Sequence, residues 1–529
     1  MTQLNRGTRG RALPFRSLTA IAFAFMVVLA ACGSGASSPT ATPSKPQRGG
    51  DLVFAHAIDI KTLDPVQAVE TETIYPLDMI FETLTETSTN GQSVVPWLAS
   101  SWDLSTDQLT WTFHLRAGVQ FSDGTPLTSA DVKFSIDRNR NFNGGFSFLD
   151  SAIKDITTPD PETVVITTKY PWKPLLADLA LWANGIYPNN FEGKTAAAFF
   201  NDPVGTGPFV LDFWNKGVST KMTRNPHYWQ PGKPYLNSVT WTFVPDDNTR
   251  ILQLKGGQIQ LDSFPPFATL NSLKASSGIT VQTFPSNLVS YVLMNEHMAQ
   301  FKDVHVRRAI AYAIDDAAMN KAALYGYGKT NCSYMAPTLS YYDPQTPCLT
   351  YNLSMAKQEL AMSAYPNGFS TSMLIGSTDV YQEAVGTIVQ QELKAININV
   401  TLDKVDPGQL YSTLAEEKYG LAYEAWASDI PDPDEQASFM LDPVGGGADS
   451  YSTGFNDSQV VQWVHQTEKA FVESQRASLY TQIQVQVAQD APWAVLQFVP
   501  YQYAFSNNVH GFFAYPTGNY HLQDVWLSQ

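Results

Sequence analysis

The spacing of apolar and polar residues predicts a mixture of strands and helices from Gly49 to the end of the chain. Leu109, Trp111, Phe113 and Leu115 alternate with polar residues, which is the period of a strand with one buried face. Similar patterns predict strands over 51–57, 164–168, 239–244 and 493–499. Apolar residues one helical turn apart predict helices over 74–84, 303–319 and 460–488.

Short polar signals mark where some of these helices begin. Thr128 and Asp131 have the spacing of a capping box, in which the side chain of each residue accepts a hydrogen bond from the backbone N–H of the other. Asp303 is a candidate N-cap for the helix that is expected to run to Met319.

The C-terminal half carries the pattern of a strand, a helix and a second strand. Residues 373–375 and 398–402 are short apolar runs, and 381–395 between them has helical spacing. Such a unit implies parallel strands and therefore an α/β domain. The apolar run 421–427 follows, and we expect it to join the same sheet.

The stretch 421–433 combines an aromatic strand with an acidic turn. Trp426 precedes Asp429, and Pro431 and Pro433 end the strand because proline lacks the N–H that a sheet needs. One interpretation is a turn acid that caps its own backbone. The other is a carboxylate that faces a cationic group on a ligand.

Composition narrows the possible functions. The chain has 529 residues, more than one hydrophobic core usually holds, so several domains are expected. Its formal net charge of −16 at pH 7 argues against nucleic acid and against electrostatic binding to anionic lipid.

The N-terminus has the pattern of an export signal. Four arginines precede the apolar stretch 18–31, which is of signal-peptide length. It ends in Leu29-Ala30-Ala31-Cys32, which resembles a lipobox, so Cys32 is expected to be acylated and to anchor the protein to the membrane. An ordinary secretory cleavage site is the alternative. Residues 33–48 are rich in Ser, Thr, Pro and Gly and are expected to form a flexible tether.

The two remaining cysteines are Cys332 and Cys348. An exported protein folds where disulfides persist, so we expect this pair to close a surface loop. In the chain-entropy estimate such a loop contributes about 3 kcal/mol. No histidine lies near them in the sequence, which argues against a metal site.

Motifs for enzymatic chemistry are missing from the sequence. There is no Gly-x-Ser-x-Gly elbow and no His-Glu-x-x-His helix, and the eight histidines are scattered. The glycines at 205 and 207 lack the third glycine of a dinucleotide loop, and Gly328-Lys329-Thr330 lacks the first glycine of a phosphate-binding loop. We therefore expect that the protein binds no cofactor and no metal and is not an enzyme. Two carboxylates far apart in the sequence could still form a pair for glycoside hydrolysis, so that alternative stays open.

Several sequence motifs together resemble those of a known family, the extracytoplasmic solute-binding proteins (family 5) of peptide-type ABC importers, which include dipeptide- and oligopeptide-binding lipoproteins. The motifs that carry the resemblance lie in order from Gly49 to the C-terminus: Thr62-Leu63-Asp64-Pro65, Trp111-Thr112-Phe113-His114-Leu115-Arg116-Ala117-Gly118-Val119, Phe121-Ser122-Asp123-Gly124-Thr125-Pro126, Gly205-Thr206-Gly207-Pro208-Phe209, Arg224-Asn225-Pro226-His227-Tyr228-Trp229, Val306-Arg307-Arg308-Ala309-Ile310 and Ala491-Pro492-Trp493.

The resemblance implies an α/β, two-lobed periplasmic-binding-protein-like fold of the class with an extra inserted domain, and a ligand cleft between the lobes. With residues 1–32 as signal peptide and 33–48 as tether, lobe 1 would comprise 49–81, 204–288 and 499–529. The inserted domain would be 82–203, and lobe 2 would be 289–498. A ligand that contacts both lobes would stabilise their closure.

The resemblance also suggests the ligand site. In peptide-binding relatives a Trp-x-x-Asp-x-x-x-Pro segment supplies the carboxylate for the peptide's α-ammonium, and the preceding backbone pairs with the peptide. Here Trp426 and Asp429 match, Ala425 and Ala427 would offer the backbone groups, and Tyr423 is a further expected ligand-binding residue.

Two positions depart from the family's pattern. Ile430 stands where the family usually has an aromatic residue after the Asp. Some relatives carry an arginine just upstream of the Trp, whereas this chain has Leu421 and Tyr423 in that region. The nearest basic residue is Lys418.

The expected function is a monomeric, lipid-anchored binding protein on the extracytoplasmic face of the membrane. It would capture peptides and deliver them to the permease and ATPase subunits of an ABC transporter. An oligosaccharide or another small solute is the alternative ligand. A surface sensor lipoprotein and a secreted hydrolase are the alternatives of other classes.

Overall fold

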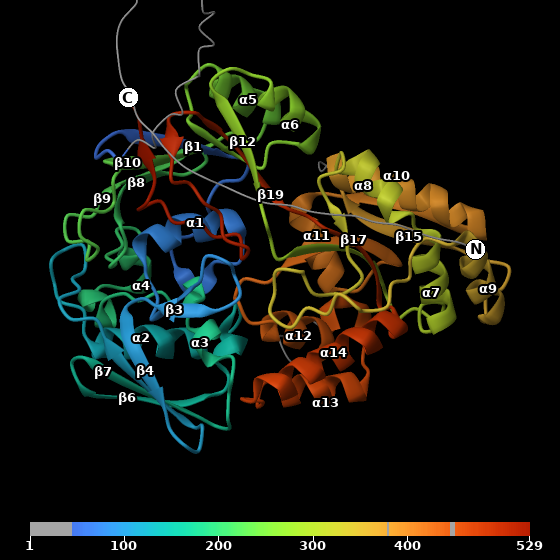
Figure 1. Ribbon diagram of the computed structural model, residues 1–529, viewed down its shortest axis with the longest axis horizontal. Helices are drawn as coiled ribbons and strands as arrows, with labels where there is room; N and C mark the ends of the chain where they lie inside the picture. Colours follow the sequence, from blue (N-terminus) through green and yellow to red (C-terminus); the bar gives the residue numbers. More distant parts are fainter. Residues whose placement is uncertain (1–44, 378–379, 445–449, 529) are drawn as a thin grey trace, which may run out of the picture. The chain divides into compact units, whose positions relative to one another are not determined.

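Three β-sheets, of seven, six and four strands, carry the architecture in the computed structural model, which describes residues 45–377, 380–444 and 450–528 (Figure 1). Each sheet has its own hydrophobic clusters. The mixed α/β fold class predicted from the sequence is confirmed by the sheets and by the structural relatives described below.

The seven-stranded sheet joins segments from the beginning, the middle and the end of the chain. Its order is β12-β19-β11-β1-β10-β9-β8, with β1 parallel to both β10 and β11. Its strands are β1 (Asp51–His56), β8 (Phe209–Asn215), β9 (Ser219–Arg224), β10 (Ser238–Phe243), β11 (Leu261–Ser263), β12 (Ile279–Phe284) and β19 (Tyr501–Ser506). With it lie α1 (Thr71–Ile80), α5 (Asp247–Lys255), α6 (Phe267–Lys274) and the small pair β20 (Val509–His510) and β21 (Trp526–Leu527).

The four-stranded sheet is antiparallel and is built from the chain between α1 and β8. Its order is β4-β5-β7-β6. Its alternating strand β5 (Thr110–Leu115) buries every second residue, as the pattern predicts. The capping box of Thr128 and Asp131 is present at the start of α2. The other elements are β2 (Thr85–Thr87), β3 (Val94–Pro96), β4 (Ala99–Leu104), β6 (Ile153–Asp160), β7 (Thr163–Thr168), α2 (Ser129–Arg140), α3 (Leu175–Asp178) and α4 (Ala196–Phe199).

The six-stranded sheet has the order β14-β18-β13-β17-β15-β16. β15 (Phe369–Gly376), α10 (Val380–Leu393) and β16 (Ile398–Val405) form the predicted parallel unit, and β17 (Leu421–Ala427) joins it as expected. The remaining strands are β13 (Leu288–Met294), β14 (Lys329–Thr330) and β18 (Trp493–Phe498).

Helices cover both faces of this sheet (Figure 1). Alternate residues of β13 belong to two different hydrophobic clusters, one on each face of the sheet. Tyr291 and Leu293 lie in one cluster, and Val292 and Met294 lie in the other. The helices are α7 (Val304–Ala313), α8 (Asp316–Ala323), α9 (Leu353–Met362), α11 (Pro407–Ala415), α12 (Asp434–Leu441), α13 (Ser458–Thr467) and α14 (Glu473–Asp490).

Three predicted helices have different limits in the structure. The helix expected from Asp303 to Met319 is divided, because Ile314 is extended and Asp315 caps the separate helix α8 by accepting from the N–H of Ala318. The helix expected over 460–488 is α13 and α14, and the one expected over 74–84 ends at Ile80. The limits of the lobes and of the inserted domain stay a prediction.

Candidate ligand-binding site

Strand β17 carries Tyr423, Ala425, Trp426 and Ala427, and Asp429 lies in the loop that follows it. One edge of β17 is paired only in part. β13 pairs with β17 from Leu421 to Ala427, whereas β15 pairs only with Leu421 and Ala422. Within the part of the chain that the structure describes, no strand pairs with Tyr423–Ala427 on the β15 side. An open edge of this kind can accept an extended peptide as an added strand.

The carboxylate of Glu424 occupies part of this open edge. The N–H of Ala425 donates to Glu424 Oε1 over 2.9 Å instead of to a strand. Backbone groups alternate along a strand, so the N–H of Ala427 points to the same edge. Burial raises the pKa of Glu424 to about 7, and its second oxygen has no hydrogen-bond partner among the described residues. A ligand strand would replace this carboxylate at Ala425.

The side chains of Trp426 and Tyr423 lie on opposite faces of β17. Trp426 stacks on Phe439 of α12, with ring centroids 4.1 Å apart. Tyr423 is buried in the other cluster and packs against Tyr381, with centroids 5.5 Å apart. The structure therefore brings Trp426 towards α12 and does not bring Tyr423 to it, because residues three apart on a strand face opposite sides.

The loop after β17 wraps around a carboxylate that the sequence analysis did not single out, that of Glu435. This side chain is fully buried in the first turn of α12. Its Oε2 accepts from the N–H groups of Asp429 (2.7 Å) and Ile430 (3.1 Å) and from the hydroxyl of Ser428 (3.0 Å). Glu435 therefore sets the conformation of the loop that carries Asp429.

Two further carboxyl groups act on the charge of Asp429, and one of them comes from a distant part of the chain. Burial, the neighbouring Glu435 carboxylate and Asp78 of α1 together raise the pKa of Asp429 well above its usual range. Burial raises the pKa of Glu435 to about 7 in spite of its three hydrogen bonds. Burial also raises the pKa of Asp78, against the opposing effect of His521.

The side chains of Asp429 and Glu435 are hydrogen-bonded to each other, and neither forms an ion pair with a lysine, arginine or histidine in the described part of the chain. A cationic group of a ligand would therefore find a carboxyl group here without a competing side chain. Lys418, the nearest basic residue in the sequence, pairs with Glu416 over 2.8 Å at the far end of β17. A buried ammonium requires a carboxylate partner, since leaving it unpaired costs several kcal/mol.

Two contacts hold the beginning and the middle of the loop. The side-chain amide of Asn287 donates to the carbonyl of Ser428 over 2.9 Å, and Asn287 lies where the chain passes from β12 to β13. Ile430 is fully buried and packs into the hydrophobic cluster of the seven-stranded sheet. The loop that follows β17 of the six-stranded sheet is thus in contact with the core of the seven-stranded sheet.

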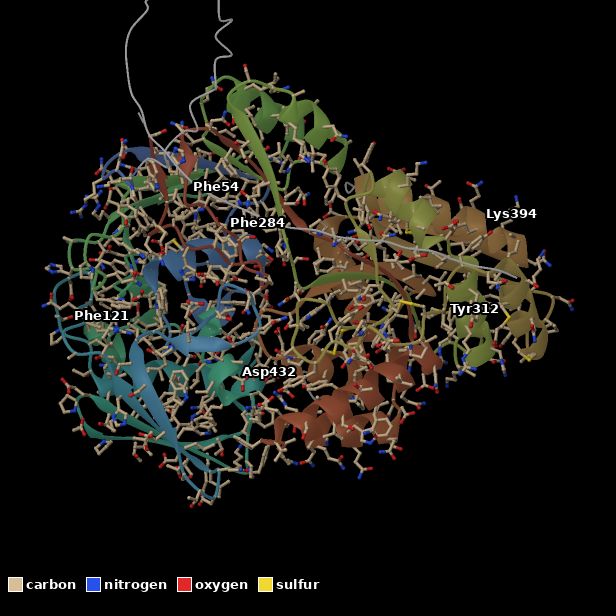
Figure 2. The ribbon with its side chains drawn as sticks, viewed as in Figure 1. Phe54, Phe121, Phe284, Tyr312, Lys394 and Asp432 are labelled. Atoms are coloured by element: carbon tan, nitrogen blue, oxygen red, sulfur yellow. A yellow bond between two sulfur atoms is a disulfide. The ribbon has the colours of Figure 1, made fainter. Side chains whose placement is uncertain are left out.

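Asp432 holds the far end of the loop against α14 (Figure 2). Its two oxygens accept from the guanidinium of Arg476 over 2.6 and 2.8 Å. Arg476 is 1% exposed, and the rings of Tyr341 and Tyr480 each lie 5.5 Å from it. This bidentate pair fixes the start of α12, and with it the position of Glu435.

The other predicted residues lie elsewhere. Cys332 and Cys348 form the expected disulfide, with their Cα atoms 4.9 Å apart. A cavity of about 50 Å³ beside this disulfide is too small for a peptide. Cys32 lies outside the described residues.

No group of three or more His, Cys, Asp or Glu side chains in the described part of the chain could hold a metal ion. None of the helices over the same residues combines the length and the apolar character needed to cross a bilayer.

Comparison with known sequences gives a family match over most of the chain. The model of the bacterial extracellular solute-binding proteins, family 5 middle, matches residues 93–448. The glutathione-binding protein GsiB of Escherichia coli (strain K12) is 30% identical over 494 residues, which cover 90% of this chain and 94% of GsiB. GsiB of Shigella dysenteriae serotype 1 is 29% identical over 491 residues, with the same coverage.

Two solved structures are similar along most of their length. The periplasmic binding protein DppA from Helicobacter pylori in complex with the peptide STSA has a TM-score of 0.82 and 26% identity, over 91% of this chain and 99% of DppA. The binding protein AgaA from A. tumefaciens R10 in complex with agropinic acid has a TM-score of 0.81 and 26% identity, over 91% of this chain and 99% of AgaA.

Proposed function

We propose that this chain, which belongs to family 5 of the bacterial extracellular solute-binding proteins, captures peptides outside the cell membrane and delivers them to an ABC permease. Members of this family are binding components of ABC importers, and the chain is a binding protein, not an enzyme. The two-lobed binding-protein fold agrees with its structural relatives.

One observation supports a peptide ligand above the others: the carboxylate of Asp429 stands at the end of a strand whose edge is open. A peptide that adds to Tyr423–Ala427 as a strand would bring its N-terminal ammonium to Asp429. Backbone pairing contributes affinity that does not depend on the ligand's side chains, while the charged hydrogen bond fixes its register. Trp426, Ala425 and Ala427 are the proposed neighbours of the ligand.

The relatives are consistent with this proposal and also support one alternative. DppA of Helicobacter pylori was solved with a peptide, and GsiB is named for glutathione, which is itself a short peptide. AgaA was solved with agropinic acid, so the same fold also accommodates a solute that is not a peptide. A small cationic solute held at Asp429 is therefore the second candidate.

We further propose that Cys32 carries the lipid anchor and that residues 33–48 link it to the folded protein. The protein would then act as a monomer on the extracytoplasmic face of the membrane and exchange ligand with the permease. Mass spectrometry of the mature N-terminus tests this proposal, because lipidation requires that the chain begins with a modified Cys32. A mature chain with an unmodified N-terminus, or one cleaved elsewhere, would contradict it.

Calorimetric titration of ligand-free protein tests the peptide proposal. Ala-Ala-Ala should bind, and its N-acetylated form should bind at least about 100-fold more weakly, since acetylation removes the charge that Asp429 pairs with. Asp429→Asn should weaken Ala-Ala-Ala by a similar factor, whereas Glu383→Gln on the exposed side of α10 should leave its affinity unchanged. Equal affinities for the free and the acetylated peptide would show that the ammonium is not recognised.

A further inference from the structure

Glu424 holds a backbone donor that a ligand strand needs. Its Oε1 accepts from the N–H of Ala425 over 2.9 Å, and this N–H lies on the edge of β17 with which no described strand pairs beyond Ala422. A peptide that adds to this edge as a strand bonds Ala425 with one of its own carbonyl oxygens. Ligand binding therefore takes the N–H of Ala425 away from the Glu424 carboxylate.

The displaced carboxylate of Glu424 needs a new partner. Its Oε2 is already buried without a hydrogen-bond donor among the described residues, and no lysine, arginine or histidine in that part of the chain forms an ion pair with Glu424. Burial raises the pKa of Glu424 to about 7, so its charged form is held at a cost. A buried carboxylate that loses a donor destabilises the complex unless the ligand supplies another donor in its place.

Strand geometry locates the ligand residue that meets Glu424. This step rests on the proposed function, in which the α-ammonium of the peptide pairs with Asp429 and the peptide runs from there antiparallel to β17. With the first ligand residue opposite Ala427, the third pairs with Ala425 and the fourth stands opposite Glu424. Residues directly opposite each other direct their side chains to the same face, with Cβ atoms about 4.5–5.5 Å apart. The fourth side chain of the ligand therefore lies beside Glu424, whereas the third lies on the other face of the sheet, as Tyr423 does.

We propose that Glu424 is a specificity-determining residue that selects peptides with a lysine or arginine at the fourth position. In the ligand-free protein the Glu424 carboxylate accepts from Ala425. In the complex a carbonyl group of the ligand takes over that N–H, and the carboxylate turns to the cationic side chain of the ligand. Opposite charges on directly facing residues stabilise the pairing of two strands, and like charges destabilise it. A glutamate at the fourth position of the ligand is therefore disfavoured.

Two isomeric pentapeptides test this selection. Ala-Ala-Ala-Lys-Ala places its lysine beside Glu424, and Ala-Ala-Lys-Ala-Ala places the same charge on the other face of the sheet. The ligand-free, full-length protein is titrated calorimetrically at about pH 8, where a carboxyl group with a pKa of about 7 is mostly ionised. The first peptide should bind at least about tenfold more tightly than the second, and Ala-Ala-Ala-Glu-Ala should bind more weakly than both.

Glu424→Gln removes the charge and keeps an oxygen that can accept from the N–H of Ala425, so the variant should fold. In this variant the preference for lysine at the fourth position over the third should disappear. Glu416→Gln is the matched control, because Glu416 is an exposed glutamate before the start of β17 that pairs with Lys418 over 2.8 Å. The preference should persist in full in the control variant.

The outcomes that overturn the inference can be told apart from a failure of the proposed function. Ala-Ala-Ala has no fourth residue, so its binding tests the proposed function alone. If Ala-Ala-Ala binds but the two pentapeptides bind equally or not at all, or if the preference survives Glu424→Gln, the selection by Glu424 is wrong and the peptide function stands. Tighter binding of Ala-Ala-Lys-Ala-Ala would contradict the place assigned to the fourth side chain. If none of these peptides binds to the folded, ligand-free protein, the proposed function fails and this inference fails with it.

Discussion

The buried carboxyl group of Glu435 gives the ligand-free protein a stability that depends on pH. Burial raises the pKa of Glu435 from its ordinary value of 4.5 to about 7. Between these two pH values the group is protonated in the folded protein and ionised in the unfolded chain. A carboxyl group with a raised pKa contributes its stability fully below pH 4.5 and loses it as the pH rises through about 7. We therefore expect the ligand-free protein to lose stability mainly as the pH rises from 4.5 to about 7, the window set by these values.

The size of this effect follows from the two pKa values. The difference between 4.5 and about 7 corresponds to about 3 kcal/mol, because one pKa unit is about 1.4 kcal/mol. Glu435 is fully buried, so solvent does not screen the effect. The charged and titratable groups that act on or near it come from several elements: Asp429 on the preceding loop, Asp78 on α1, Asp178 on α3, Tyr501 on β19 and, through Asp78, His521.

The perturbation is Glu435→Gln. The amide oxygen can still accept from Ser428, Asp429 and Ile430, and the amide NH₂ would face the carboxylate of Asp429. Wild type and variant should be about equally stable at pH 5. At pH 8 the variant should be the more stable one, by up to about 3 kcal/mol.

Urea unfolding of protein freed from bound ligand, followed by tryptophan fluorescence at both pH values, provides the measurement. Glu383→Gln is the control, because Glu383 lies on an exposed face of α10 and pairs with Lys404. It should follow the wild type at both pH values. Equal losses of stability in wild type and Glu435→Gln between pH 5 and pH 8 would refute the account of Glu435 as a buried, proton-binding carboxyl group.

Other predictions concern the loop, the disulfide and one close backbone approach. Asp432→Asn leaves the buried guanidinium of Arg476 without its partner and should lower the free energy of unfolding by about 3–5 kcal/mol; an unchanged urea midpoint would contradict this. Cys332→Ser opens the disulfide loop and should cost about 3 kcal/mol in the same assay without changing peptide affinity; a variant as stable as the oxidised wild type would show that the loop is held by other contacts. Gly205→Ala would set a methyl group 2.0 Å from the carbonyl oxygen of Ile80 and should destabilise by at least about 2 kcal/mol, seen as a lower Tm; an unaffected Tm would mean that the backbone gives way easily there.

Local signals in the sequence predicted much of the fold. The alternation in β5, the capping box of Thr128 and Asp131 and the parallel unit of β15, α10 and β16 all depend on neighbouring residues, and all are present. The break at Ile314 was missed because both halves of the expected helix have apolar residues at helical spacing. The capping bond of Asp315, which decides between one helix and two, is a single contact within that pattern.

The candidate site was predictable only in part. The odd spacing between Tyr423 and Trp426 already implies opposite faces of a strand, and that signal could have separated them in the sequence. Glu435 was harder to find, because Asp432, Asp434 and Glu435 form one acidic run. Which of the three turns towards Asp429 depends on where α12 begins.

The sequence by itself determined many of the strands and helices, though not all of their limits, and the disulfide, and it made Asp429 a candidate through the motif around Trp426. These properties follow from interactions between residues that are near in the chain or from a pattern of residue types. Tertiary structure alone decided that the charges of Asp78 and Glu435 act on Asp429 and that Ile430 packs into the core of the seven-stranded sheet. It also decided that, among the described residues, no strand pairs with β17 beyond Ala422 on the β15 side. The physical reason is that burial and charge at a site depend on which distant segments come together, and no local pattern encodes that meeting.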